Sequence, residues 1–307
     1  YDKNIEFILV DDESTDNTKD TIYEVIKNDS RFKYASSKSG HKNLKRKQKA
    51  LDAGIQEAAF NHLLFTDVDC HIPKNWVTIM EQYYGSGYNY LVGNSIVKTN
   101  NKFNWVSSFQ RIDFLLLMII CRASSYFKSP WACTGQNQGF TKNLYQRAGG
   151  FQKIRNFIGD DTAFMYLCKG YGAKLCFIDN ANATVNPRVE THFVKFISQR
   201  VRWVADANKI WKLNLWFFIT MLMTYLFYIS IPITILSASL SYKLIGALLC
   251  IKMTMEYFLI LFGAQKLSVS IFKKDFIIWQ ILHVPYICIV GLLSYFPYLF
   301  TWKGRKL

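Results

Sequence analysis

The chain has 307 residues, half of them hydrophobic and 16% aromatic, which is enough for one sizeable domain and a further region. Its 37 lysines and arginines outnumber 22 aspartates and glutamates, and the formal net charge of +15 favours an acidic partner such as a membrane surface, a phosphate-bearing substrate or nucleic acid. The sequence has no RNA-binding aromatic motif and no zinc-finger spacing, so we expect no nucleic-acid partner.

The first part of the chain predicts alternating strands and helices. IEFILV, Ile5–Val10, is an almost continuous apolar run that is typical of a buried parallel strand. The following DDESTDNT is rich in helix-capping residues and predicts a helix from about Thr15 to Lys27. We then expect a strand at Phe32–Ser36, a basic helix at Lys42–Ala59 and a strand at His62–Asp67. This order predicts an α/β domain with a parallel sheet.

Carboxylates follow two of these strands. Asp11 and Asp12 end the first strand, and ligands bind beyond the carboxyl ends of strands in such sheets. Asp67 and Asp69 end the third, two residues apart, so in an extended chain they point the same way. Two such carboxylates form a hard oxygen site suited to Mg²⁺ or Mn²⁺, which can bridge the phosphates of a nucleotide. D-x-D is a weak motif alone, and its place after a buried strand strengthens it.

A second pair of carboxylates, Asp160 and Asp161, follows a glycine and leads into an apolar, helix-like run. One interpretation is that one aspartate caps the helix and the other sits in its favourable first turn. The other interpretation is that the site needs a carboxylate at a fixed place to accept a proton. This stretch by itself favours the helix cap.

QRVRW places Gln199, Arg202 and Trp203 at positions i, i+3 and i+4, on one face of a helix. Arginine offers a planar fork for phosphate oxygens, and tryptophan offers a flat surface on which a sugar ring can stack. The alternative is an amphipathic helix at the membrane surface, with Arg200 and Arg202 facing lipid phosphates. Both can hold, because the motif directly precedes an apolar segment.

The last third of the chain is strongly apolar. Three candidate membrane segments are Leu215–Leu236, Leu244–Ala264 and Phe276–Phe300. The alternative, three buried core helices, is disfavoured by several turns of almost unbroken apolar sequence. Lys252 and Glu256 lie four residues apart, so we expect a paired arrangement that faces the helix bundle, since a lone charge in lipid is costly.

We expect a multi-pass membrane protein with its catalytic domain in the cytosol. Seven scattered cysteines without a C-x-x-C pair favour a reducing compartment. If all three segments crossed the membrane, the basic C-terminal KGRKL would lie outside, against the positive-inside tendency. The third segment, interrupted by Pro285 and Pro297, is therefore a candidate re-entrant segment.

Together, VDDESTDNT, TDVDC, GDD and QRVRW, followed by membrane segments, resemble the inverting membrane glycosyltransferases of family two, which have the GT-A fold. This group includes cellulose, chitin and hyaluronan synthases and many single-sugar transferases. Each motif alone is weak evidence for this resemblance. The four motifs occur in the family's order and approximate spacing over nearly the whole chain, and together they are strong evidence. The resemblance implies an α/β, GT-A-type (Rossmann-like) nucleotide-sugar domain at residues 1–212 and an α-helical membrane region of about three helices at residues 213–307.

The resemblance also implies residues that bind the donor and a metal ion. The first acidic pair, Asp11 and Asp12, would contact the uracil and ribose, with Asp12 favoured. Lys47 stands where the family often has a lysine before an A-L pair. Asp67 and Asp69 correspond to the D-x-D motif, in which the second aspartate usually binds Mg²⁺ or Mn²⁺ and both approach the diphosphate.

The remaining motifs imply the catalytic and acceptor residues. Asp161 corresponds to the family's base, and Asp160 stands where glutamate is usual and would cap the helix or orient the acceptor. Gln199 and Arg202 would steady the diphosphate, and Trp203 would form the floor of the acceptor site.

We therefore predict a membrane-anchored inverting glycosyltransferase that moves a sugar from a UDP-linked donor to a hydroxyl of a lipid-linked or glycan acceptor, in cell-envelope polysaccharide biosynthesis. The alternatives are a processive polysaccharide synthase, for which three membrane segments are few, and an inactive membrane scaffold, which intact acidic motifs disfavour.

The family begins with a strand and loop that cover the uridine, and neither is present here, so we expect a fragment or an incomplete donor site. The loop Thr134–Phe140, TGQNQGF, resembles the family's acceptor-side loop, although its glycines equally mark turns.

Overall fold

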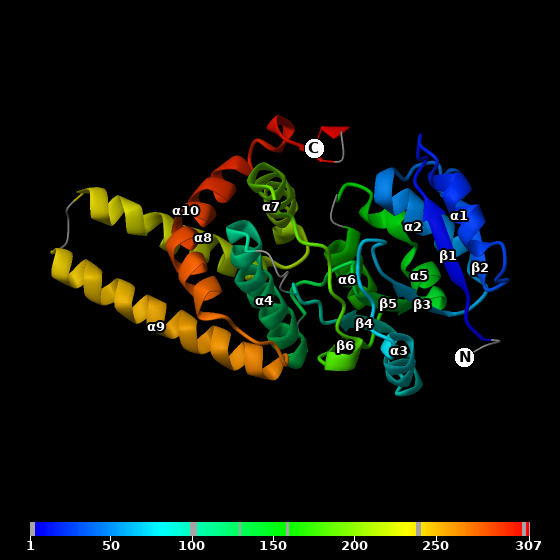
Figure 1. The fold of residues 1–307 in the computed structure, drawn as a ribbon, viewed down its shortest axis with the longest axis horizontal. Helices are drawn as coiled ribbons and strands as arrows, with labels where there is room; N and C mark the ends of the chain where they lie inside the picture. Colours follow the sequence, from blue (N-terminus) through cyan, green and yellow to red (C-terminus); the bar gives the residue numbers. More distant parts are fainter. Residues whose placement is uncertain are drawn as a thin grey trace. The chain divides into compact units, whose positions relative to one another are not determined.

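The structure, a computed structural model, describes residues 4–98, 103–128, 130–157, 160–237, 241–302 and 305–306 (Figure 1). The chain forms two compact units. Unit 1 comprises Tyr1–Phe65, Met80–Val92 and Gln138–Cys176. Unit 2 comprises Thr66–Ile79, Gly93–Asn137 and Phe177–Leu307.

Unit 1 begins with two parallel strands, β1 (Phe7–Asp11) and β2 (Phe32–Ser36). The helices α1 (Thr18–Ile26) and α2 (Arg46–Glu57) pack on this pair (Figure 1). A Cβ at Gly54 of α2 would lie 2.8 Å from a methyl group of β1, so the glycine permits the close approach of helix and strand. The predicted β-α-β-α order of this region is confirmed, with helix ends that differ by a few residues.

The prediction of one parallel sheet that includes the third strand is wrong. β3 (His62–Phe65) belongs to a separate sheet with strand order β3-β5-β4-β6, where both β3 and β4 (Tyr90–Gly93) pair antiparallel with β5 (Gln138–Thr141). The fourth strand is β6 (Leu175–Ile178). A Cβ at Gly139 would lie 2.5 Å from the Tyr84 hydroxyl, so β5 fits only with a glycine there. Periodicity shows that a segment is a strand, and a segment far along the chain decides its partner.

An aromatic core anchors the second half of unit 1. Phe164 lies on α6 (Asp160–Gly170), and its ring centroid is 4.9 Å from Phe140 and 4.8 Å from Phe151. All three side chains are almost completely buried. Burial of a phenylalanine contributes roughly 1.5–3 kcal/mol, so this core fixes the position of α6.

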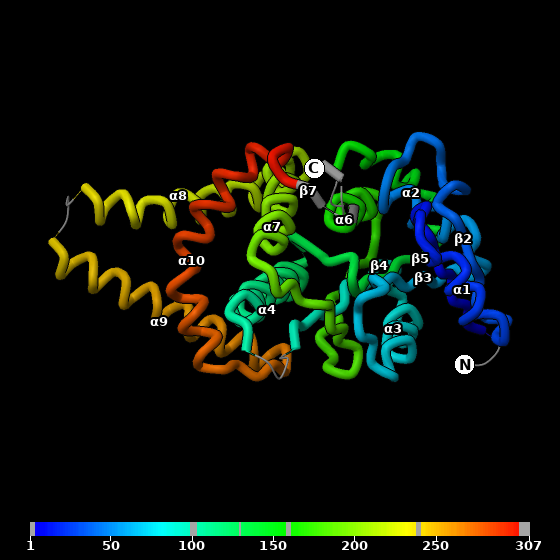
Figure 2. The backbone as a smooth tube through the Cα atoms, turned by 45° about the horizontal axis from the view of Figure 1, so that its top comes forward, coloured from blue at the N-terminus to red at the C-terminus, as the bar shows by residue number. Residues whose placement is uncertain are grey.

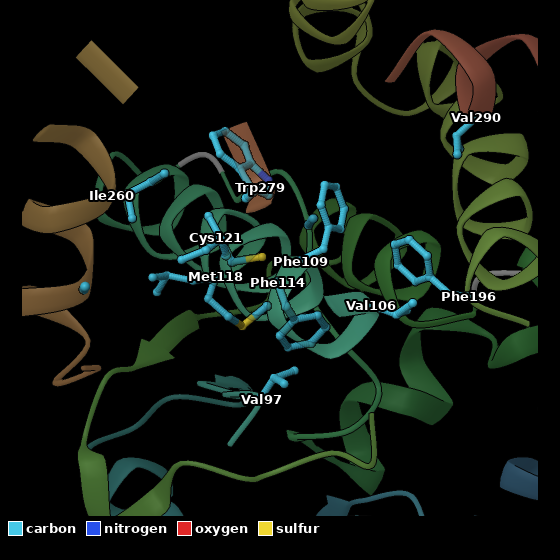
Figure 3. Close-up of a cluster of buried hydrophobic side chains, with 14 of the residues drawn as sticks. Val97, Val106, Phe109, Phe114, Met118, Cys121, Phe196, Ile260, Trp279 and Val290 are labelled. Atoms are coloured by element: carbon cyan, nitrogen blue, oxygen red, sulfur yellow. The ribbon is translucent and has the colours of Figure 1, made fainter. Parts of the chain in front are cut away.

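Unit 2 is built on packed helices. α4 (Trp105–Tyr126), α7 (Phe193–Ala207) and α10 (Lys273–Leu293) contact one another (Figure 2). Their buried side chains form one hydrophobic cluster, in which α4 supplies the centre and the other helices add to it (Figure 3). The labelled members are Val97, Val106, Phe109, Phe114, Met118, Cys121, Phe196, Ile260, Trp279 and Val290.

Among the residues that the structure describes, three helices of unit 2 have the length and the apolar composition needed to cross a membrane. They are α8 (Leu215–Ser237), α9 (Tyr242–Lys266) and α10. In the most apolar stretches of α8 and α9, 6% of the residues are buried, and in that of α10, 17%. Helices that expose most of their apolar surface are not core helices, so the alternative of three buried core helices is wrong. The 23 residues of α8 extend over about 34 Å, enough for a bilayer core.

The charged pair of α9 is arranged as predicted. The Lys252 ammonium lies 2.8 Å from a carboxylate oxygen of Glu256. Tyr228 of α8 donates a hydrogen bond to the same carboxylate, and Gln280 of α10 donates another over 2.7 Å. The pair therefore faces neighbouring helices, which satisfy its polar groups in an apolar environment.

The third apolar segment ends earlier than expected. α10 stops at Leu293 and contains Pro285, while Pro297 starts the short helix η5 (Pro297–Leu299). Residues 303, 304 and 307 of KGRKL lie outside the described residues. The re-entrant arrangement of this segment stays a prediction.

The remaining elements are short. They are η1 (Ser37–Ser39), α3 (Trp76–Gly85), α5 (Lys142–Ala148), η2 (Phe151–Ile154), η3 (Ala181–Ala183), η4 (Ile210–Lys212), β7 (Thr301–Trp302) and β8 (Arg305–Lys306).

Candidate functional site

The D-x-D motif forms a tight turn directly after β3. The backbone N–H of Cys70 donates a hydrogen bond of 3.0 Å to the carbonyl oxygen of Asp67, which closes the turn. One ligand atom each from Asp67, Asp69 and Cys70 lies within 4.8 Å of the others. The convergence of the two carboxylates is confirmed, but a turn brings them together rather than the alternation of an extended strand.

The chemistry of this donor set fits a divalent cation that prefers oxygen. Asp67 is partly exposed and Asp69 is exposed, so a bound ion would keep positions open to water and phosphate oxygens. Burial, followed by the nearby charges of Asp67 and Asp69, raises the pKa of the Cys70 thiol to about 11. Because Mg²⁺ and Mn²⁺ prefer carboxylate oxygens to a thiol, Asp67 and Asp69 are the candidate ligands for such a cation.

Backbone pairing fixes the residues that follow the turn. The N–H of His71 donates to the carbonyl of Asn186 over 2.8 Å, and the N–H of Asn186 donates back over 3.0 Å. Trp76, at the start of α3, is buried and donates its indole N–H to the Asn137 side-chain oxygen over 2.8 Å. The segment that follows the D-x-D turn is thus held at two points by other parts of unit 2.

Sequence reasoning missed Asn137 as a supporting residue. It is completely buried, and its amide nitrogen donates to the carbonyls of Asn94 and Ala183 over 2.7 and 2.9 Å. A Cβ at Gly93 would lie 2.2 Å from the Asn137 side chain, so a glycine is required beside it. The only sequence signal was the polar loop TGQNQGF, which contains this asparagine between two glycines.

The first acidic pair lies at the end of β1 in unit 1. Asp11 is buried and accepts hydrogen bonds from the Ser14 N–H over 3.1 Å and from the Tyr34 hydroxyl over 3.2 Å. Hydrogen bonding from Ser14 above all holds the pKa of Asp11 below its usual range. Asp12 is exposed and is followed by Glu13, whose φ of 58° turns the chain. Asp11 stabilises the turn, and Asp12 is the accessible member of the pair.

Lys47 lies on the exposed side of α2. The next residue, Gln48, is buried and donates its amide N–H to the carbonyl of Phe157 over 2.7 Å. This contact ties α2 to the segment that leads into α6.

The second acidic pair opens α6. Asp160 is the first helical residue, and its side chain lies outside what the structure describes. Asp161 is partly buried, and its carboxylate accepts a hydrogen bond of 2.8 Å from the Thr162 N–H. The helix start stabilises negative charge, and Phe164 anchors the helix one turn further on. A carboxylate fixed at a helix start is what both the cap and the proton-acceptor interpretation require.

The QRVRW motif lies on α7, and its second residue behaves differently from the prediction. Gln199, Arg202 and Trp203 are partly exposed. Arg200 is 3% exposed and forms an ion pair of 2.9 Å with Asp113 of α4. The prediction that Arg200 faces lipid phosphates is therefore wrong, because Arg200 shares the buried side of the helix with residues such as Phe196, four positions earlier.

The site residues predicted from the sequence lie in both units. Unit 1 holds Asp11, Asp12, Lys47, Asp160 and Asp161, and unit 2 holds Asp67, Asp69, Gln199, Arg202 and Trp203. The structure brings Asp67 and Asp69 together within unit 2 and places Gln199, Arg202 and Trp203 along one helix.

Comparisons with known proteins place these residues in context. The model of a family described as Glycosyl transferase family 2 matches residues 1–155. This range includes both strand-end acidic pairs and Lys47 and ends five residues before Asp160. No curated protein matches the chain. A solved structure described as the crystal structure of a mycobacterial protein is 12% identical, with a TM-score of 0.40, over 68% of this chain and 65% of that one.

Proposed function

The chain belongs to glycosyl transferase family 2, whose model covers residues 1–155 of its 307, and from this membership we propose a specific reaction. The enzyme is a glycosyltransferase with three helices able to cross a membrane. The proposed reaction moves a sugar from a UDP-linked donor to a hydroxyl of a lipid-linked or glycan acceptor, with inversion at the anomeric carbon. The observation that carries this proposal is the D-x-D turn, which holds two carboxylates together after a strand.

Asp67 and Asp69 are the proposed ligands of a divalent cation. When bound, Mg²⁺ or Mn²⁺ offsets the negative charge of the diphosphate leaving group. Asp69 is the more exposed of the two carboxylates, which supports its role as the principal ligand. Asp12, exposed at the end of β1, binds the nucleoside together with Asp11, and Lys47 supplies positive charge toward the donor.

Asp161 is the proposed base. As the acceptor hydroxyl attacks the anomeric carbon, its proton passes to the Asp161 carboxylate and the bond to the diphosphate breaks on the opposite side. A positioned base contributes about 10²–10⁴-fold to such a step. The anchoring of α6 by the aromatic core supports this role, because a base must hold its place relative to the reacting hydroxyl. Asp160 caps the helix or orients the acceptor.

Residues of α7 complete the proposed site. Gln199 and Arg202 bind the diphosphate, since a guanidinium matches phosphate oxygens. Trp203 provides the surface on which the acceptor sugar stacks. Their partial exposure on one helix face supports these roles.

We further propose that residues 1–212 form the catalytic domain in the cytosol and residues 213–307 the membrane region. The seven cysteines are scattered along the sequence without a C-x-x-C pair, which supports a reducing compartment. Lys266 ends α9, and Lys273 and Lys274 begin α10, so positive charge flanks the connection between these helices, in agreement with a cytosolic connection. The protein should stay in the membrane pellet after an alkaline carbonate wash, and its release into the supernatant would contradict membrane crossing.

A donor screen tests the proposed reaction. The detergent-purified protein is incubated with UDP-linked sugars and octyl glycosides, and UDP release and product length are measured. We expect UDP release with the addition of single sugars. Polymeric products would instead assign a processive synthase of the cell envelope, and no turnover with any nucleotide sugar would favour an inactive scaffold.

A further inference from the structure

Arg200 is a buried cation that the proposed reaction does not use. It lies on α7 between Gln199 and Val201 and is 3% exposed. Asp113 of α4 neutralises it over 2.9 Å, and Tyr286 of α10 accepts a hydrogen bond from the same guanidinium. Three helices of unit 2 therefore meet at this one side chain.

The guanidinium lies over the ring of Trp203. Its central carbon is 4.1 Å from the Trp203 ring centroid and 5.1 Å from that of Phe196. A cation within about 6 Å of an aromatic centroid is held by the ring's electrons, and tryptophan is the strongest partner. One side of the Trp203 indole is thus occupied from within the protein, while the residue stays partly exposed.

Stability alone does not account for an arginine in this place. Its Nε and Nη1 atoms are buried without a hydrogen-bond partner among the residues that the structure describes. Burying unpaired donors is unfavourable, and a well-packed apolar side chain often replaces a buried ion pair without loss of stability. The flat, charged guanidinium provides what an apolar side chain cannot, a planar cation over the indole ring.

We propose that Arg200 is a positioning residue that sets the orientation of the Trp203 ring for acceptor binding. Asp113 and Tyr286 hold the guanidinium, and the guanidinium holds the indole. This inference rests on the proposed function, which assigns the acceptor surface to Trp203. It also gives α10 a part in acceptor binding, through Tyr286.

A double-mutant cycle with Arg200→Met and Trp203→Ala tests the proposal. UDP release is measured with UDP-sugars as donors and octyl glycosides as acceptors. Arg200→Met should raise the acceptor KM about tenfold and change the donor KM less than about twofold. In the Trp203→Ala background the same substitution should have almost no further effect, since coupled residues are not additive. If the increases in acceptor KM caused by the two substitutions multiply in the double variant, the two residues act independently and the proposal is overturned.

The same cycle separates failure of this inference from failure of the proposed function. If Trp203→Ala leaves the acceptor KM unchanged, the acceptor role of Trp203 is wrong, and the inference falls with it. If Trp203→Ala raises the acceptor KM and Arg200→Met does not, only the inference is wrong.

Two further variants guard against misfolding. Arg200→Met leaves Asp113 as an unpaired buried charge, so the pair Arg200→Met/Asp113→Leu removes both charges at once. This pair should melt close to the parent enzyme and still show the raised acceptor KM, and a normal KM would overturn the proposal. Arg200→Lys keeps the charge without the planar fork and should not restore the KM, whereas full restoration would mean that charge alone matters.

A measurement without turnover completes the test. The difference in near-ultraviolet circular dichroism between the parent and Trp203→Phe reports how rigidly this indole is held. In the Arg200→Met/Asp113→Leu background that difference should fall by more than about half, if stacking fixes the ring. An unchanged difference would overturn the proposal even if no acceptor is known.

Discussion

The two acidic pairs at Asp67/Asp69 and Asp160/Asp161 use the same residue type in opposite ways. In the first, a turn after β3 brings two carboxylates within 4.8 Å, where they repel each other until a cation neutralises them. In the second, the two residues open α6, and the N-terminus of a helix stabilises negative charge such as that of the Asp161 carboxylate. The comparison teaches that backbone geometry, rather than residue type, decides whether neighbouring aspartates converge in a turn or follow one another at a helix start.

Metal removal is expected to have the largest effect. Chelation with EDTA should abolish turnover, and Mn²⁺ or Mg²⁺ should restore it, because the D-x-D carboxylates act through the cation. Asp69→Asn should reproduce the loss. Val68 lies between the two aspartates with a fully exposed side chain, so Val68→Thr is the matched control and should keep activity within about twofold. Full turnover in the presence of EDTA would show that Asp67 and Asp69 do not act through a metal ion, and the proposed difference between the two acidic pairs would be wrong.

The helix-start pair is tested by neutral substitutions, with the next largest effect. Asp161→Asn keeps the shape, removes the base and should lower kcat by about 10²–10⁴-fold while UDP-sugar affinity stays nearly unchanged. Asp160→Asn should be milder, because asparagine caps a helix about as well as aspartate. Rates and melting temperatures of both variants are the measurement. If both variants show similar small losses of activity that follow their melting temperatures, the pair only caps α6. If Asp160→Asn causes the larger loss of activity, Asp160 rather than Asp161 is the base.

The buried support of the D-x-D turn sharpens the comparison further. Asn137→Ala leaves the Trp76 indole N–H and two backbone carbonyls without their partner, and each buried group left unpaired costs about 1–3 kcal/mol. We expect a lower melting temperature and a weaker activation by Mn²⁺, measured by titration. Gln82→Ala, at an exposed position on α3, is the control and should change neither quantity. A stable variant with normal activation would show that the turn holds its shape without Asn137.

The smallest effect is expected at Cys70. Its thiol lies near the two carboxylates, but Mg²⁺ and Mn²⁺ prefer oxygen ligands, so we expect the thiol to contribute little to the site. Cys70→Ser should leave the Mn²⁺ concentration for half-maximal activity within about twofold. A tenfold increase in that concentration would show that the Cys70 thiol is a third ligand, in addition to the two carboxylates.

The amino-acid sequence by itself determined the local elements and the motifs at their ends. Apolar runs and capping residues placed β1, α1, β2 and α2 within a few residues, because these signals act over one or two turns of chain. The three apolar helices followed from length and composition. The Lys252–Glu256 pair followed from the 3.6-residue period, which puts residues four apart on one face.

Only the tertiary structure decided which distant segments meet. β3 pairs with β5, more than seventy residues later, and no local pattern in either strand specifies an antiparallel partner. Arg200 is charged and precedes a long apolar helix in the sequence, yet it is buried, because Asp113 and Tyr286 from two other helices surround it. Asn137 is central for the same reason, since its partners come from three separate parts of the chain. Burial and pairing depend on contacts between residues far apart in sequence, and these exist only once the chain has folded.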